Sequence, residues 1–150
     1  ERPLVLGATL AGAPQELVAA LSAAGEPLGE AFQLRDDELG VFGDPDVTGK
    51  PAGDDIAEGK LTPLILLGCD MANADDAAFI RQHLGDRAIS PAAVERIRAV
   101  LQTSGAFARH EELITQRQDL SRRLFDAAQI PPTIRVELAE LAVSLTSRSH

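Results

Sequence analysis

Apolar residues recur along most of the chain at helical spacing, and no segment shows the clean alternation of apolar and polar residues that marks a strand. The commonest residue types, such as alanine, leucine, glutamate and arginine, favour helices. The pattern predicts a buried helix over residues 4–10 and an amphipathic helix from Pro14 to about Phe42. Gly25 and Pro27 lie inside this second helix and predict a kink or a break, since proline removes a backbone hydrogen-bond donor.

Glycine and proline divide the rest of the chain into further helices. They recur closely over residues 43–53, which predicts a loop, and Asp54 or Asp55 then provides an N-cap. Gly85 predicts a helix end, and the Ser90-Pro91 pair predicts a helix start. The later helices are expected at residues 54–70, 73–84, 91–103, 105–128 and 132–147. The predicted fold class is therefore all-α, in a single domain or part of one.

The composition is that of a globular protein and excludes several other classes. Of the 150 residues, 45% are hydrophobic and 25% are charged. A net charge of −9 argues against a nucleic-acid partner, which requires a cationic surface. No apolar run approaches the roughly 20 residues that span a membrane. The single cysteine, Cys69, excludes a disulfide framework, and nothing indicates secretion, so a cytoplasmic location is expected.

Residues suited to metal and phosphate binding gather around the loop that follows the second predicted helix. Asp36 and Asp37 come three and four residues after Gln33, so all three lie near one helix face. Paired carboxylates suit Mg²⁺, although an isolated aspartate pair is more often a solvated surface. The chain's two lysines, Lys50 and Lys60, each follow a glycine here, and an ammonium group suits phosphate. Together these residues predict a Mg²⁺–diphosphate site.

The order of these motifs resembles that of a known family. The chain contains in succession Phe32-Gln33-x-x-Asp36-Asp37, Gly43-Asp44, Gly49-Lys50, Gly53-x-Asp55 and Gly59-Lys60-x-Thr62. This run resembles the second aspartate-rich region of trans-type isoprenyl diphosphate synthases, which form the polyprenyl synthetase family. The resemblance implies the C-terminal part of an antiparallel helical isoprenoid synthase fold, usually as a homodimer. Because the chain begins at Glu1 without a first aspartate-rich motif, residues 1–150 are expected to be the C-terminal half of one domain, inactive alone.

The resemblance also implies a role for each matching residue. Asp36 and Asp37 are expected to bind the Mg²⁺ that bridges the allylic diphosphate, and Lys50 to contact that diphosphate. Phe32 and Gln33 are expected to face isopentenyl diphosphate and the reacting carbons. Lys60 is expected to support the same polar cluster, and Asp55 to cap a helix. The implied activity is condensation of isopentenyl diphosphate with an allylic diphosphate to a short-chain (C15–C20) all-trans product, with Gln33 and Lys50 in catalytic roles.

One departure from the family pattern leaves alternatives open. The family motif is Asp-Asp-x-x-Asp, and Gly40 stands in the third acidic position. A metal-ligand role is then expected to pass to Asp44 or to water. Gly40 and the missing first motif are also compatible with a non-catalytic partner subunit of a heteromeric synthase, while the intact Gly-Lys pairs argue for the enzyme. A terpene cyclase is disfavoured, because cyclases use an Asn/Ser/Glu metal motif.

Overall fold

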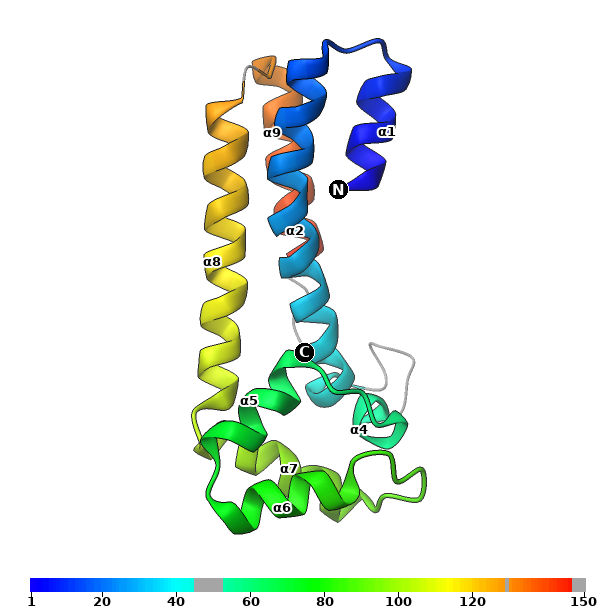
Figure 1. Cartoon of the computed structure of the whole chain (residues 1–150), viewed down its shortest axis with the longest axis vertical. Helices are drawn as coiled ribbons and strands as arrows, with labels where there is room; N and C mark the ends of the chain where they lie inside the picture. The colour runs from blue at the N-terminus through cyan, green and yellow to red at the C-terminus, as the bar shows by residue number, and fades with distance from the viewer. Residues whose placement is uncertain (45–52, 129, 147–150) are drawn as a thin grey trace. The chain divides into compact units, whose positions relative to one another are not determined.

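The computed structural model describes residues 1–44, 53–128 and 130–146, and every regular element in these ranges is a helix. This confirms the predicted all-α fold class for the described part of the chain. The helices, drawn in Figure 1, are α1 (Arg2–Leu10), α2 (Gln15–Phe42), α4 (Asp54–Glu58), α5 (Pro63–Met71), α6 (Ala74–His83), α7 (Pro91–Thr103), α8 (Ala106–Ala127) and α9 (Pro132–Thr146).

The chain divides into two compact units, each with its own apolar core. The first unit combines Glu1–Gln33 with Leu113–Ser149, and the second comprises Leu34–Glu112. In the first unit, α2, α8 and α9 lie alongside one another (Figure 1). Their core consists of Leu21, Ala24 and Leu28 on α2, Phe125 on α8, and Ala128 and Ile130 between α8 and α9, with Leu138 of α9 packed against it. In the second unit, α5, α6 and α7 pack together around a core that includes Ile65, Ile80, Ile97 and Leu101.

The two N-terminal helices depart from the sequence predictions in one respect each. Helix α1 forms as predicted, but it is not a buried helix, since Leu6 and Leu10 are 60% and 79% exposed. Of the kink or break predicted at Gly25 and Pro27, the break does not occur, because Pro27 lies inside one continuous helix α2. Pro27 and its neighbour Leu28 are both buried. Burial of this apolar face therefore offsets the roughly 3 kcal/mol that an internal proline costs a helix.

The helix predicted over residues 54–70 is in fact two helices. Helix α4 ends at Gly59, whose φ of +76° is a left-handed conformation that glycine adopts without strain. Helix α5 then begins after Thr62, whose side chain accepts a hydrogen bond from the Ile65 backbone N–H. The prediction of Asp54 or Asp55 as N-cap is also wrong, because Gly53 takes that position and both aspartates lie in the first helical turn.

A backbone hydrogen bond joins α4 to the turn after α6. The Gly85 N–H donates a hydrogen bond to the Ile56 carbonyl at 2.8 Å. A Cβ atom on Gly59 would lie 3.1 Å from the Cα of Gly85, a tight contact that would require one of the two segments to shift by a few tenths of an ångström. Gly85 itself has a φ of +86°. The two glycines therefore fix where α4 ends.

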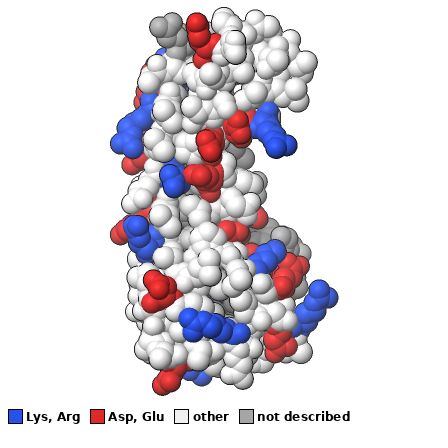
Figure 2. Space-filling model, viewed as in Figure 1, with Lys and Arg blue, Asp and Glu red and all other residues white. Residues whose placement is uncertain are grey.

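The remaining helix limits agree with the sequence predictions within the described ranges, and the helix end predicted at residue 147 lies outside them. Asn73 and Ser90 cap α6 and α7 by accepting hydrogen bonds from the Asp76 and Ala93 backbone N–H groups. Acidic and basic side chains are interspersed over the face shown in Figure 2. Within the described ranges, no helix combines the length and the apolar character needed to cross a membrane.

Candidate functional site

The predicted metal ligands lie on α2, in the part that belongs to the second unit. Asp36 is exposed, whereas Asp37 is only 8% exposed. Being adjacent on a helix, the two side chains leave it about 100° apart. One carboxylate therefore faces solvent, and the other lies against the packed interior of the unit.

A partly buried polar network lies beside Asp37. The Arg35 guanidinium donates hydrogen bonds to Glu38 Oε1 at 2.7 Å and to Glu111 Oε1 at 2.5 Å, which ties α2 to α8. Burial, with a further contribution from Glu111, raises the pKa of Glu38 to about 8. The hydrogen bond with Glu38 lowers the pKa of Glu111. At neutral pH Glu38 therefore keeps its proton, and the Glu111 carboxylate and the Arg35 guanidinium carry the charges.

His110 fixes the same turn of α2 from a second side. It is fully buried, and its Nε2 lies 2.9 Å from the Leu34 carbonyl oxygen, to which the protonated Nε2 donates. Burial lowers the pKa of His110, although this hydrogen bond and the charge of Asp37 act in the opposite direction. His110 is therefore a structural residue that holds α8 against α2. Its neutral ring joins α8 to the backbone just before Asp36.

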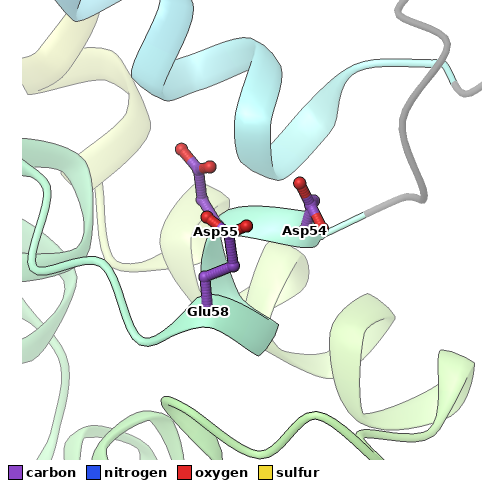
Figure 3. Close-up of side chains that lie close together, drawn as sticks. All are labelled: Asp54, Asp55 and Glu58. Atoms are coloured by element: carbon purple, nitrogen blue, oxygen red, sulfur yellow. The ribbon is translucent and has the colours of Figure 1, made fainter.

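A second acidic group lies on α4. Asp54, Asp55 and Glu58 all lie on this short helix (Figure 3), and one carboxylate oxygen of each lies within 4.8 Å of the others. Lys60 Nζ is 2.5 Å from Asp55 Oδ1 and 2.9 Å from Glu58 Oε2. These hydrogen bonds raise the pKa of Lys60. The lysine ammonium is therefore the cation that two of the three carboxylates already bind.

Asp55 also contacts α2 at the place where the family motif has its third aspartate. A Cβ atom on Gly40 would overlap Oδ2 and Cγ of Asp55 and would lie 2.9 Å from its Oδ1. The Asp55 carboxylate thus lies against α2, one turn beyond Asp36 and Asp37. The sequence pattern did not predict this contact. The available signal was the presence of a glycine at a position where the motif has an acidic residue.

The structure describes the other predicted site residues except Lys50. Phe32 is half-buried and Gln33 is exposed, both at the end of the first unit and on the same helix α2 that carries the two aspartates. Lys60 is joined to Asp55, as described above, and its side chain is 46% exposed. Lys50 lies outside the described residues. Asp44 is exposed just after α2. The structure therefore joins Lys60 to α2 through Asp55 and leaves the role of Lys50 as a prediction.

Comparison with known proteins gives consistent results. Residues 1–101 match the polyprenyl synthetase family. A geranylgeranyl diphosphate synthase of Mycobacterium tuberculosis is 36% identical over 100 residues, which cover 67% of this chain and 29% of that protein. A (2E,6E)-farnesyl diphosphate synthase of the same species is 33% identical over 150 residues, covering 95% of this chain and 41% of that protein. The chain thus spans less than half the length of these relatives.

Solved structures show the same helical fold. A geranylgeranyl pyrophosphate synthase from Corynebacterium glutamicum, complexed with isoprenyl diphosphate and magnesium, matches with a TM-score of 0.90 and 41% identity over 96% of this chain and 41% of that chain. A polyprenyl synthase from Caulobacter crescentus, complexed with calcium and isoprenyl diphosphate, matches with a TM-score of 0.85 and 34% identity over 97% of this chain and 44% of that chain. On the family match over residues 1–101 and these relatives, the chain belongs to the polyprenyl synthetase family.

Proposed function

We propose that this chain is part of a Mg²⁺-dependent trans-prenyltransferase that condenses isopentenyl diphosphate with an allylic diphosphate into a short-chain (C15–C20) all-trans prenyl diphosphate. The observation that carries the proposal is the family match, because residues 1–101 include the aspartate pair and both Gly-Lys pairs. The farnesyl and geranylgeranyl diphosphate synthases among the relatives support the product class. A homodimer is part of the same proposal.

The donor set at Asp36 and Asp37 fits Mg²⁺. Magnesium prefers one or two carboxylates together with water and substrate phosphate oxygens. An exposed and a nearly buried carboxylate on one rigid helix provide this combination, with Asp36 open to solvent. When bound, Mg²⁺ would neutralise charge on the diphosphate leaving group. The Corynebacterium structure, which contains magnesium and isoprenyl diphosphate, supports this assignment.

The chain's own side chains then have distinct tasks in the reaction. The allylic C–O bond breaks, the double bond of isopentenyl diphosphate attacks the resulting carbocation, and a proton leaves. Lys50 and Lys60 stabilise negative charge on the departing diphosphate, since preorganised cations act most strongly where charge develops. Phe32 and Gln33 face isopentenyl diphosphate and the reacting carbons. Exclusion of water from the site protects the carbocation.

The test uses protein expressed from the full-length gene. Turnover is measured as incorporation of labelled isopentenyl diphosphate into an extended prenyl chain, with Mg²⁺ present. The variants Asp36→Ala and Asp37→Ala should each reduce kcat by about 100-fold or more, because each removes a group that stabilises the leaving group.

Asp75→Ala is the matched control. Asp75 is also the first residue of an adjacent aspartate pair, but it is exposed in the first turn of α6. Its loss should leave turnover close to the wild-type value. Near-normal turnover of both the Asp36 and the Asp37 variants would contradict the proposed function.

A further inference from the structure

Position 40 of α2 is filled by a carboxylate from another helix. Gly40 follows Asp36 and Asp37 by four and three residues, so it lies near their side of the helix. Because a Cβ on Gly40 would overlap the Asp55 carboxylate, that carboxylate occupies the space where a side chain at position 40 would begin. The Gly40 residue is therefore the reason that α4 can bring an acidic group against α2.

Asp55 is held in this place by Lys60. The Asp55 side chain is only 6% exposed, and a charge buried to that extent requires a close partner of opposite sign. The Lys60 ammonium supplies it at 2.5 Å and also contacts Glu58. Lys60 remains 46% exposed, so its remaining N–H group can meet a ligand from solvent. Asp55 is therefore the buried residue of this pair, packed against α2, and Lys60 is the residue accessible to solvent.

We propose that Asp55 is a positioning residue. Its carboxylate packs against α2 at Gly40, where no side chain intervenes, and it orients the Lys60 ammonium toward a diphosphate ligand bound near Asp36 and Asp37. Asp55 thereby delivers a carboxylate from α4 to the third position of the aspartate-rich motif, and position 40 must remain glycine. The ligand part of this inference rests on the proposed function, whereas the packing of Asp55 on Gly40 does not.

The same arrangement argues against a second metal at the acidic group on α4. Two of its three carboxylates, those of Asp55 and Glu58, contact the Lys60 ammonium at hydrogen-bond distance. A metal ion there would have to displace a cation that is attached to the chain and therefore has a high local concentration. The group is accordingly a lysine-binding site within the protein.

The first experiment tests the packing without any ligand. Thermal unfolding of the full-length protein is compared for Gly40→Ala in the wild-type and in the Asp55→Ala background. The substitution should lower Tm in the wild type and have a smaller effect, or none, when the Asp55 carboxylate is absent, because coupled positions are not additive. Gly29→Ala is the control on the same helix, since its Cβ would have no neighbour closer than 3.9 Å. Equal losses from Gly40→Ala in both backgrounds would overturn the proposed packing.

The second experiment tests positioning through Lys60. Binding of magnesium pyrophosphate to the full-length protein is measured by calorimetry. Gly40→Ala and Asp55→Asn should each weaken binding about tenfold, as expected when one charge-assisted hydrogen bond is misaligned. Neither should cause a further loss in a Lys60→Met background, because their effect passes through the ammonium. Unchanged affinity in both single variants, or full additional losses in the Lys60→Met background, would refute the positioning role.

A rescue variant moves the carboxylate from one helix to the other. Gly40→Asp combined with Asp55→Ala should regain most of the lost affinity, whereas Gly40→Asp alone should bind weakly because two carboxylates then compete for one space. Failure of the combined variant to bind better than Asp55→Ala contradicts the inference. A wild-type protein that does not bind magnesium pyrophosphate refutes the proposed function instead, and the thermal experiment still decides whether Asp55 packs on Gly40.

Discussion

Replacement of Glu38 by glutamine should remove a pH dependence of stability that the wild-type protein has. Burial raises the pKa of Glu38 from 4.5 to about 8, with Glu111 contributing to the rise. Glutamine has the shape of a protonated glutamate: its oxygen can accept the hydrogen bond from Arg35, and its amide group can donate to Glu111. The substitution therefore keeps the neutral form of the side chain at every pH.

The sign and the size of the effect follow from this raised pKa. In the unfolded chain Glu38 loses its proton near pH 4.5, whereas in the folded protein it keeps the proton up to about pH 8. Its contribution to stability is thus fully present below pH 4.5 and is lost as the pH rises through about 8. At roughly 1.4 kcal/mol for each pH unit, the upper limit is about 5 kcal/mol. The lowered pKa of Glu111 acts in the opposite direction and keeps the net effect below this limit.

The assay is urea-induced unfolding, followed by circular dichroism, between about pH 5 and pH 9. Wild-type protein and the Glu38→Gln variant should have similar free energies of unfolding at the acidic end. The variant should become the more stable protein by about 2 kcal/mol or more at the alkaline end. Glu112→Gln is the control, because Glu112 is an exposed residue next to Glu111 on α8 and pairs with Arg109 at 2.8 Å. Parallel pH profiles for wild type and Glu38→Gln would refute the reasoning.

Three further predictions concern stability and metal dependence. His110→Ala should lower the free energy of unfolding by about 3 kcal/mol, because it leaves a cavity and removes the hydrogen bond to the Leu34 carbonyl. Urea-induced unfolding measures this loss, and a loss under about 1 kcal/mol would contradict the prediction. Thr62→Ala should cost about 1 kcal/mol by removing the N-cap of α5, and no measurable loss in the same assay would contradict this. A chelator should abolish prenyl transfer by the full-length protein, and added Mg²⁺ should restore it; turnover that persists without divalent metal would argue against the Asp36–Asp37 assignment.

Sequence alone predicted those features that depend on residues close together in the chain. Asn73 and Ser90 were identifiable as helix starts because an N-cap acts within three residues of itself, and the start of α7 at Pro91 agrees with the prediction. The aspartate pair was likewise placed on a helix from its local context, and α2 does contain both residues. Gly59 shows where local patterns fail. Its left-handed conformation ends α4 within the segment 54–70, which the sequence pattern predicts to be one helix.

Contacts between distant segments could not be predicted in this way. The position of Asp55 against Gly40 depends on how α4 packs on α2, and nothing in the fifteen-residue spacing encodes it. The burial of Glu38 and its link to Glu111 on α8 are of the same kind. The exposure of α1 also follows from packing, because apolar composition indicates that a helix can be buried and does not identify its neighbour.

The backbone contact between Gly59 and Gly85 has a consequence for protein engineering. Backbone atoms of the two segments meet where the end of α4 lies against the turn after α6, so a methyl group at position 59 would require them to shift by a few tenths of an ångström. Because Asp55 lies on the five-residue helix α4 that ends there, we expect even a small shift to disturb the contact of its carboxylate with α2 at Gly40. Libraries that diversify this region should therefore keep both glycines fixed and randomise the exposed positions 86–88, whose side chains face solvent.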